Sequence, residues 1–428
     1  MIKIIKDCAG DRQSVFSAVE KKVDVSSVVS QIIQNVKDNG DKALFEYAEK
    51  FDKVKLDTLA VKKEEIIAAK SAVEPEFLAV LERAAANIKK FHLEQKREGF
   101  EIKESDGIII GQKIIPVDRA GLYVPGGTAA YPSTVLMDAI PAKIAGVKEV
   151  VMVTPPDKNG GVNPVILAAA AVAGVDKIFK VGGAQAIAAL AYGTESIPKV
   201  DKIVGPGNAF VAEAKKQVFG QVSIDMIAGP SEIMVVADAD NNPVHLAADL
   251  LSQAEHDKNA SAVLITDSEE MAKEVSIELE KQIPLLERME IARASIDQNG
   301  KIIIVDNIDR AIELANQIAP EHLELCVAEP FSALEKIRHA GSVFLGKFCP
   351  EALGDYFAGT NHTLPTSGTA KFSSPLSVDD FIKKTQYIYY DESALRKTYK
   401  DVEYFAKKEG LTAHAKSATV RFEGIENE

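Results

Sequence analysis

A carboxylate and an imidazole stand next to each other in the run Ile318-Ala319-Pro320-Glu321-His322-Leu323-Glu324. Proline fixes its own φ angle, so it restrains the approach to this pair. Histidine titrates near neutral pH, and a neighbouring carboxylate can exchange a proton or polarise a water molecule. Glu321 and His322 are therefore a candidate acid–base pair, with a structural polar turn as the equal alternative.

A second group of residues has the chemistry of a metal site. Gln253 and His256 are three residues apart, a spacing that on a helix brings two β-carbons to about 5 to 6 Å. Asp355 and His414 could complete a nitrogen and oxygen ligand set suited to zinc. Glutamine is an uncommon zinc ligand and the segments lie far apart in the sequence, so a helix-face hydrogen bond with a surface histidine is the alternative. His362, in a turn-rich setting, is either a site residue or an exposed loop histidine.

Glycine pairs at Gly126-Gly127 and Gly182-Gly183 follow strand-like runs and precede helices of small residues. Their backbone amides could face a phosphate group at a helix N-terminus. No segment has the GxGxxG pattern, and the nearest, beginning at Gly205, carries Phe210 in place of the third glycine. These patterns alone do not predict nicotinamide binding.

The composition excludes several classes of protein. The chain has 428 residues and a formal charge of -13, which argues against a nucleic-acid or anionic-membrane partner. Its longest apolar run, Val165 to Val175, is far shorter than the roughly 20 residues that cross a bilayer. The N-terminal residues lack the features of a secretory signal, so we expect a cytoplasmic protein. Three cysteines without a CxxC pair predict no disulfides, and Cys326 is expected to be a packed, inert thiol.

The elements that must position these residues follow from the apolar patterns. Residues before about 100 are helical in pattern, and we expect the first strong helix, which carries Val28 to Val36, to end at Gly40-Asp41. Short β-branched runs then alternate with helical stretches, which is typical of βαβ units. The predicted strands are 149–154, 177–181, 202–204, 232–237, 262–266, 301–305, 323–327 and 342–345.

The two series of strands predict an α/β fold with two Rossmann-like, doubly wound sheets and ligands at the carboxyl ends of their strands. Glu321 and His322 would occupy the connection between the helix 308–318 and the next strand. From about Ser377 the chain is aromatic and charged, with a helix at 391–408. This tail is too small for a core of its own, so it should pack on the body or on a second chain.

Taken together, these motifs resemble the histidinol dehydrogenase family. The resemblance runs nearly end to end, through segments that begin at Gly121, Tyr131, Val181, Gly205 and Asp225, followed by the histidine-containing segments above. It implies an NAD-dependent, zinc-dependent four-electron oxidation of L-histidinol through L-histidinal to L-histidine. It also implies a homodimer, an N-terminal helical piece (1–22), a first Rossmann-like domain (23–123 and 232–376), an inserted second one (124–231) and a C-terminal tail (377–428) exchanged between subunits.

Roles for individual residues follow from the same resemblance. His322 would be the acid–base residue and Glu321 would activate water for oxidation of the aldehyde. Zinc ligands would be Gln253, His256 and Asp355, with His414 from the second subunit, and all four would also contact the substrate. The remaining contacts would be Ser231, His362, Glu409 and His322 itself for substrate, and Tyr123, Gln185 and Asn208 for the dinucleotide.

A zinc hydrolase in which Glu321 activates metal-bound water, with no dinucleotide, is the alternative function. Such an enzyme is expected to carry a compact ligand motif such as HExxH, which this chain lacks. A non-catalytic relative is a weaker alternative, because such a chain would usually have lost some acid–base or ligand residues. The sequence therefore favours the oxidoreductase.

Overall fold

The computed structural model describes residues 2–7, 24–104, 106–126 and 130–423. These residues fall into two units, one made of Met1–Lys96 with Val117–Phe381 and the other of Arg97–Pro116 with Ile382–Glu428. Among the described residues, no helix is both long and apolar enough to span a membrane.

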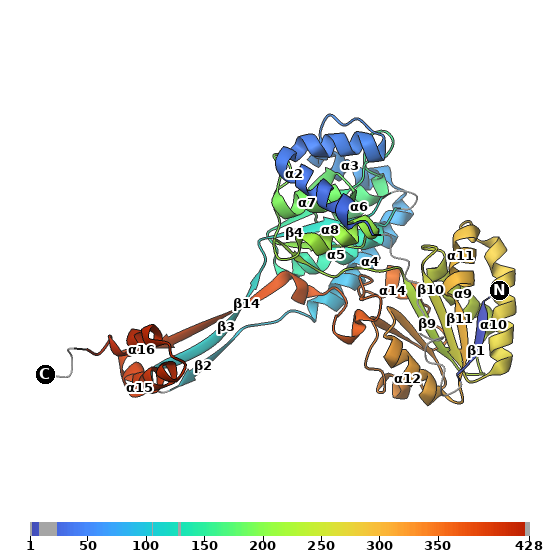
Figure 1. Ribbon diagram of the computed structural model, residues 1–428. Coiled ribbons are helices and arrows are strands. Elements are labelled where there is room, and N and C mark those ends of the chain that lie inside the picture. Colours follow the sequence, from blue (N-terminus) through green and yellow to red (C-terminus); the bar gives the residue numbers. More distant parts are fainter. Residues whose placement is uncertain (1, 8–23, 105, 127–129, 424–428) are drawn as a thin grey trace. The chain divides into compact units, whose positions relative to one another are not determined.

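The first unit contains a five-stranded parallel sheet in the order β6-β5-β4-β7-β8, of which Figure 1 labels β4. Its strands are β4 (Arg119–Tyr123), β5 (Glu149–Thr154), β6 (Lys177–Lys180), β7 (Lys202–Val204) and β8 (Ser223–Ile224). Numbered along the chain, the order is 3-2-1-4-5, that of a doubly wound sheet with a switch point between β4 and β7. The strands predicted at 149–154, 177–181 and 202–204 are confirmed. Their apolar runs made them predictable, since strands that helices cover on both faces are apolar along their whole length.

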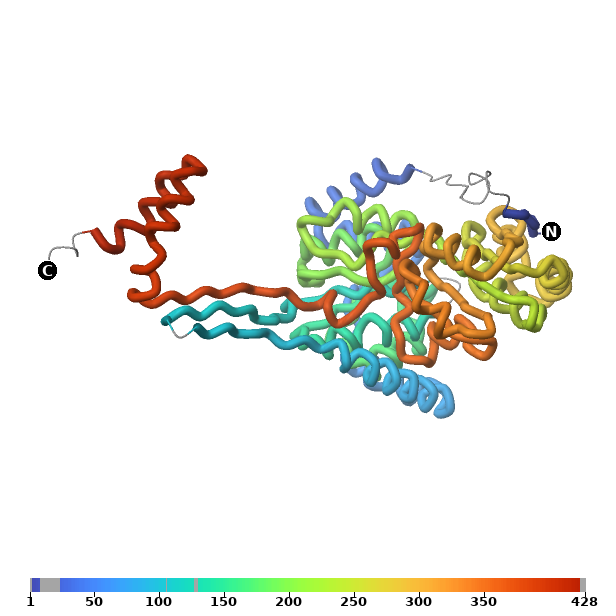
Figure 2. The backbone as a smooth tube through the Cα atoms, turned by 90° about the horizontal axis from the view of Figure 1, so that it is seen from below, coloured from blue at the N-terminus to red at the C-terminus, as the bar shows by residue number. Residues whose placement is uncertain are grey.

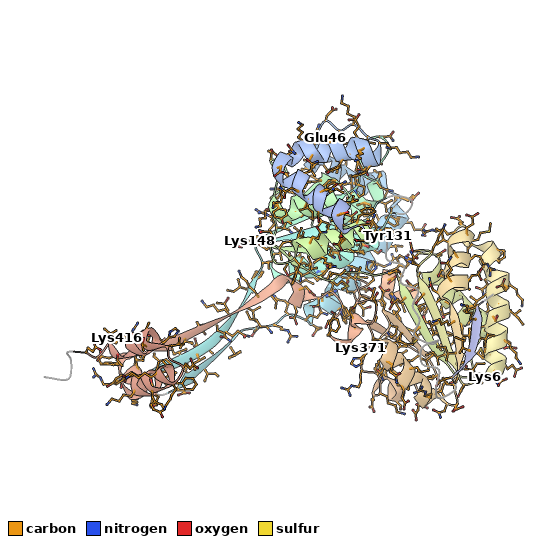
Figure 3. The ribbon with its side chains drawn as sticks, in the orientation of Figure 1. Lys6, Glu46, Tyr131, Lys148, Lys371 and Lys416 are labelled. Atoms are coloured by element: carbon orange, nitrogen blue, oxygen red, sulfur yellow. The ribbon has the colours of Figure 1, made fainter. Side chains whose placement is uncertain are left out.

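Helices cover both faces of this sheet. One face packs against α2 (Ser26–Tyr47), α7 (Gly183–Tyr192) and α8 (Ala209–Val218), and the other against α3 (Lys63–Ala72), α4 (Pro75–Leu93), α5 (Pro132–Ala145) and α6 (Pro164–Ala173). Figure 3 labels Tyr131, which directly precedes α5.

The first helix does not end where predicted. Gly40 adopts non-helical angles (φ 50°, ψ -131°), but the helix resumes and continues to Tyr47, followed by a π-helix, η1 (Ala48–Asp52). The main-chain N–H of Asp41, which the break exposes, donates to Glu195 Oε2 at 2.8 Å. An acceptor from a remote segment thus lets the helix restart, which local propensity does not predict.

A six-stranded parallel sheet forms the rest of this unit, in the order β1-β11-β10-β9-β12-β13. Its strands are β1 (Lys3–Lys6), β9 (Glu232–Ala237), β10 (Ser261–Thr266), β11 (Lys301–Ile304), β12 (His322–Cys326) and β13 (Ser342–Leu345). Apart from β1 at the edge, the order is again 3-2-1-4-5. Helices α9 (Pro243–Ala254), α10 (Glu269–Gln282) and α11 (Met289–Asn299), with η2 (Ile283–Leu285), cover one face, and α12 (Ile308–Ile318) and α13 (Pro330–Leu334) cover the other (Figure 1).

The two Rossmann-like sheets confirm the predicted fold class, with two differences in the parts around them. Lys3–Lys6 form a strand that pairs with β11, so the predicted helical segment 1–22 is wrong at these residues, and its residues 8–22 lie outside the described ones. Helices α2, α3 and α4 and strand β4 pack with the five-stranded sheet, whereas the predicted boundary at residue 123 assigned them to the other domain. Apolar periodicity marks a buried helix face but does not identify its partner.

The second unit is a three-stranded antiparallel sheet with two helices. Its strands β2 (Phe100–Glu104), β3 (Ile108–Pro116) and β14 (Ile382–Tyr390) run alongside one another in the order β14-β3-β2 (Figure 2). Helices α15 (Glu392–Lys408) and α16 (Thr412–Thr419) follow β14. The C-terminal segment therefore shares its sheet with a hairpin from residues 100–116.

Candidate active site

The Glu321–His322 pair lies in the predicted connection between α12 and β12. Ala319 ends α12 with a left-handed φ of 57°, and Pro320 then leads the chain toward the sheet. His322 is the first residue of β12 and lies between Ile233 of β9 and Ser342 of β13. The pair is thus at the amino ends of these strands, as its place between a helix and the following strand predicts.

The main chain of Glu232 contacts both members of the pair. Its N–H donates to Glu321 Oε2 at 2.8 Å, and its carbonyl oxygen accepts from His322 Nδ1 at 3.0 Å. Both side chains are buried. Because Nδ1 donates to this carbonyl oxygen, Nε2 is the ring nitrogen that faces the rest of the cluster.

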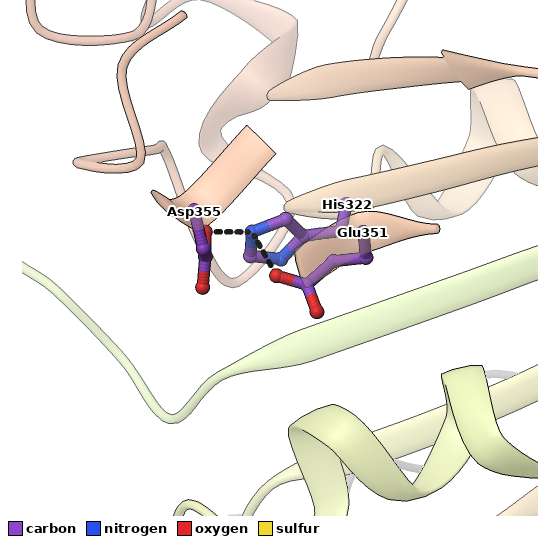
Figure 4. Close-up of side chains that lie close together, drawn as sticks. All are labelled: His322, Glu351 and Asp355. Carbon is purple, nitrogen blue, oxygen red and sulfur yellow. Dashed lines mark ion pairs between the residues drawn. The ribbon is translucent and has the colours of Figure 1, made fainter. Parts of the chain in front are cut away.

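Two carboxylates face that nitrogen. His322 Nε2 lies 3.6 Å from Glu351 Oε1 and 3.6 Å from Asp355 Oδ1 (Figure 4). Glu351 and Asp355 are four residues apart on α14 (Glu351–Tyr356), hence on one face of the helix. Nε2 of His322 and Oε1 of Glu351 are buried and have no hydrogen-bond partner among the described residues.

Burial and charge act against each other in this cluster. Burial would lower the pKa of His322, but Glu321, Asp355 and Glu351 raise it to about 10. Burial raises the pKa of Glu321 to about 8, and burial with the charge of Asp355 raises that of Glu351 to about 7. Asp355 is the exception, because the rings of His322 and His362 outweigh its burial and lower its pKa to about 2. The cluster holds more acidic groups than its imidazole can balance, which favours a bound cation.

Three of the four residues predicted as metal ligands, Gln253, His256 and Asp355, lie at or beside this cluster. Gln253, in the last turn of α9, is buried, and its side chain acts to lower the pKa of Glu351 against the larger effect of burial. His256 follows that helix, and its charge interacts with Asp355, although burial dominates and lowers its pKa. Ligand atoms of His322, Glu351 and Asp355 all lie within 4.8 Å of one another. Imidazole, carboxylate and amide donors with orphaned polar atoms fit a transition metal such as zinc.

His362 borders this cluster from the segment between α14 and η3 (Thr369–Lys371). Its Nδ1 lies 4.0 Å from Asp355 Oδ1, and its Nε2 lies 3.1 Å from the hydroxyl of Thr134 on α5. Burial lowers the pKa of His362. Ser231 directly precedes β9, is half-buried, and its carbonyl oxygen accepts from the N–H of Ser261. The structure thus places His362 at the cluster and Ser231 next to Glu232.

The residues predicted to face a dinucleotide lie at the carboxyl ends of the five-stranded sheet. Tyr123 ends β4, and its hydroxyl oxygen accepts from the N–H of Gly183 at 3.1 Å. Gln185 is buried in the first turn of α7, with its side chain against Gly183, where an added Cβ would lie 2.8 Å from Gln185 Oε1. Asn208 caps α8 by accepting from the N–H groups of Phe210 and Val211. These positions flank the switch point between β4 and β7.

Comparison with known proteins identifies the family. The family model described as histidinol dehydrogenase matches residues 17–422. A protein named histidinol dehydrogenase from Clostridium acetobutylicum is 55% identical over 427 residues, 99% of each chain, and one from Bacillus thuringiensis subsp. konkukian is 58% identical over 398 residues, 93% of this chain and 92% of the other. The crystal structure of histidinol dehydrogenase from Elizabethkingia anophelis matches with a TM-score of 0.94 at 39% identity, covering 100% of this chain and 99% of that one.

The chain belongs to the histidinol dehydrogenase family. The predicted resemblance and enzyme class, an NAD-dependent oxidoreductase, are thereby confirmed. Two residues implied by the family resemblance, Glu409 and His414, lie in the second unit. Glu409 follows α15, His414 lies in α16, and both are exposed there.

The site also contains Glu351, which sequence reasoning missed. This residue is buried, its Oε2 accepts from the hydroxyl of Ser252 at 2.8 Å, and its Oε1 faces His322. Its spacing of four from Asp355 is the available signal, since it places two carboxylates on one helix face. Cys326, by contrast, is buried as predicted, and burial raises the pKa of its thiol, which makes it inert.

Proposed function

We propose that this chain oxidises L-histidinol through L-histidinal to L-histidine, with NAD as the acceptor of two hydrides. The observation that carries the proposal is His322, whose ring is held at Nδ1 by Glu232 while Nε2 faces a cluster of potential metal ligands. Membership of the histidinol dehydrogenase family supplies the substrate.

His322 is the acid–base residue in this proposal. As the carbinol carbon gives up a hydride, the hydroxyl proton passes to Nε2 of His322 and the carbonyl of the aldehyde forms. The second oxidation requires a hydrated aldehyde. Glu321 takes a proton from water as its oxygen adds to the aldehyde carbon, while the protonated His322 gives its proton to the aldehyde oxygen, so the hydrate forms and His322 is a base again. His322 then takes a hydroxyl proton of the hydrate as the second hydride leaves. The products are a carboxylate and two reduced dinucleotides.

Zinc is the metal we propose for the site, held by Gln253, His256 and Asp355, with His414 provided by a second copy of the chain. When bound, zinc supplies positive charge and a template for the imidazole and amino nitrogens of histidinol. The excess of carboxyl groups around His322 and the orphaned atoms of His322 and Glu351 support a cation here. Ser231, His362 and Glu409 are the further substrate contacts in this proposal.

NAD, when bound, supplies the hydride acceptor, and we propose that it lies at the carboxyl ends of β4, β6 and β7. Tyr123, Gln185 and Asn208 are the proposed contacts, supported by their place at the switch point of a doubly wound sheet. A homodimer is required by the shared ligand His414. Cytoplasmic residence stays a prediction from the sequence.

Incubating the purified protein with L-histidinol, NAD and zinc while following NADH absorbance tests the proposal. Two NADH and one L-histidine per histidinol are the expected products. Absence of NADH formation with zinc-loaded protein would overturn the proposal and favour the alternative function, a zinc hydrolase. Removing the metal with a chelator should abolish turnover, and re-addition of zinc should restore it.

A further inference from the structure

A second group of buried ionisable side chains lies away from the candidate metal cluster. It borders the segment Gly205-Pro206-Gly207, which precedes Asn208 and is called the Gly205 turn below. The group consists of Asp138 on α5, Lys215 on α8 and Asp225 after β8. The side chains of Lys215 and Asp225 are 2% and 1% exposed, and Asp138 is fully buried. The group therefore contains two buried carboxyl groups and one buried ammonium.

Asp225 has the contacts of an ionised carboxylate. It pairs with Lys215, and it accepts from the N–H of Gly205 at 2.8 Å and from that of Met226 at 2.6 Å. Lys215 Nζ also donates to the carbonyl oxygen of Gly205 at 2.9 Å. The pair therefore holds Gly205 through both of its main-chain polar groups.

The Gly205 turn admits no side chain. Gly205 has a φ of 114°, and a Cβ added there would lie 2.1 Å from the carbonyl oxygen of Tyr123 and 3.0 Å from Asp138 Oδ2. Asp138 is thus packed directly behind the turn that leads to Asn208, one of the proposed dinucleotide contacts.

Asp138 itself lacks the contacts of an ionised group. Its Oδ1 accepts from the hydroxyl of Thr363 at 3.1 Å, and its Oδ2 has no hydrogen-bond partner among the described residues. Among the described residues, the ammonium beside these carboxyl groups is that of Lys215, which already pairs with Asp225, so a second buried negative charge at Asp138 would be unfavourable. Burial, with the charge of Asp225, raises the pKa of Asp138 well above its ordinary value.

Among the residues that the structure describes, the other elements that pack on α5 bring no cation to Asp138. Helix α4 brings His92, whose ring contacts Gln95 and Asn361, and α6 has no ionisable residue. Arg119 of β4 pairs with Glu149 of β5, and Asp380 of η4 (Val378–Phe381) pairs with Lys202.

Helix α5 also holds the segment that carries His362. Thr134 contacts the His362 ring, the carbonyl oxygen of Met137 accepts from Asn361 Nδ2 at 2.7 Å, and Asp138 accepts from Thr363. Asp138 is the residue of these three that also borders the Gly205 turn.

We propose that Asp138 is a positioning residue that carries its proton at neutral pH and joins the Gly205 turn to the segment that bears His362. A neutral acid can accept from Thr363 without adding a second buried charge. In its kinetic consequences the inference rests on the proposed function, because the Gly205 turn and His362 would then serve the dinucleotide and the substrate.

Thermal unfolding of Asp138→Asn against wild type tests the protonation state without any activity. The pKa of Asp138 is raised in the folded protein, so its contribution to stability is complete below the unfolded pKa of about 3.9 and is lost as pH rises above it. Asparagine keeps the shape and cannot ionise. The Tm of the variant relative to wild type should therefore rise between pH 4 and pH 8, by about 2 to 4 °C. A Tm difference between variant and wild type that stays constant or falls over this range overturns the proposal. As a control, Asp225→Asn leaves the buried ammonium of Lys215 without its charged partner and should lower Tm at every pH.

Steady-state kinetics tests the positioning role. Asp138→Ala, which loses the contact with Thr363, should raise KM for NAD and lower kcat for histidinol, each by about 2- to 10-fold. Asp138→Asn should restore both to within about twofold, as the loss of a single neutral hydrogen bond predicts. If Asn is as damaging as Ala, or Ala leaves both constants unchanged, the positioning role is wrong. Absence of turnover in wild type as well would instead refute the proposed function, and the melting series would still stand.

Discussion

His322 donates its Nδ1–H to the main-chain carbonyl of Glu232 at 3.0 Å. The acceptor is a backbone atom at the start of the neighbouring strand, so the ring orientation is set by strand register. The same residue's N–H binds Glu321. One residue of β9 thus fixes both the tautomer of the imidazole and the direction of the carboxylate beside it.

His322→Gln should lower the rate of histidinol oxidation by about 10²- to 10⁴-fold, the usual contribution of a general base. The glutamine fills the space but cannot accept the hydroxyl proton. NADH formation under saturating histidinol and NAD is the measurement, with His245→Gln, at an exposed position of α9, as the matched control. Unchanged turnover in His322→Gln would show that another group is the base.

Glu321→Gln should slow oxidation of the aldehyde more than oxidation of the alcohol. The amide oxygen can still accept from the N–H of Glu232, so the local structure is kept while the base for water is lost. Rates with histidinal and with histidinol as separate substrates give the comparison. Equal losses in both half-reactions would count against water activation by Glu321.

Mixing two inactive variants tests whether His414 acts across a dimer. In a heterodimer of His414→Ala with His322→Ala, one site has the intact body of the first chain and the intact tail of the second. Random exchange of equal amounts should restore about a quarter of wild-type activity, since half of the dimers are mixed and each has one complete site. Mixed dimers that form and stay inactive would exclude the exchange.

Asp52→Asn should stabilise the protein at alkaline pH and not at pH 4. Burial raises the pKa of Asp52, at the end of η1, to about 6. The stability that its neutral form contributes is complete below the unfolded pKa of about 3.9 and is lost as pH rises through 6. The Tm difference from wild type should appear between these pH values and then stay level, with Asp57→Asn at an exposed position as the control. A variant less stable than wild type at pH 8 would contradict the shift.

Buried strands were the most predictable part of the fold. Glu149–Thr154 and Glu232–Ala237 are continuous apolar runs because helices cover both faces of a parallel sheet, and this pattern is visible without any partner. The Glu321–His322 pair was equally visible, since its two groups are adjacent in the chain.

What could not be predicted depends on long-range pairing. The Lys3–Lys6 strand is recognisable only from its partner β11, and α2 continues past Gly40 only because Glu195 binds the exposed N–H of Asp41. Glu351 stands in an ordinary short helix, and only the approach of α14 to β12 gives its carboxylate a role.

The pairing of β1 with β11 has a consequence for synthesis of the chain. Lys3 lies opposite Lys301, so β1 is synthesised some 300 residues before the strand with which it pairs. Contacts of such large sequence separation slow folding, because the conformational entropy of the intervening chain is lost before the strand pairing contributes favourable free energy. We therefore expect the five-stranded sheet to form before β1 pairs with β11. The β1 edge of the six-stranded sheet should form late in folding.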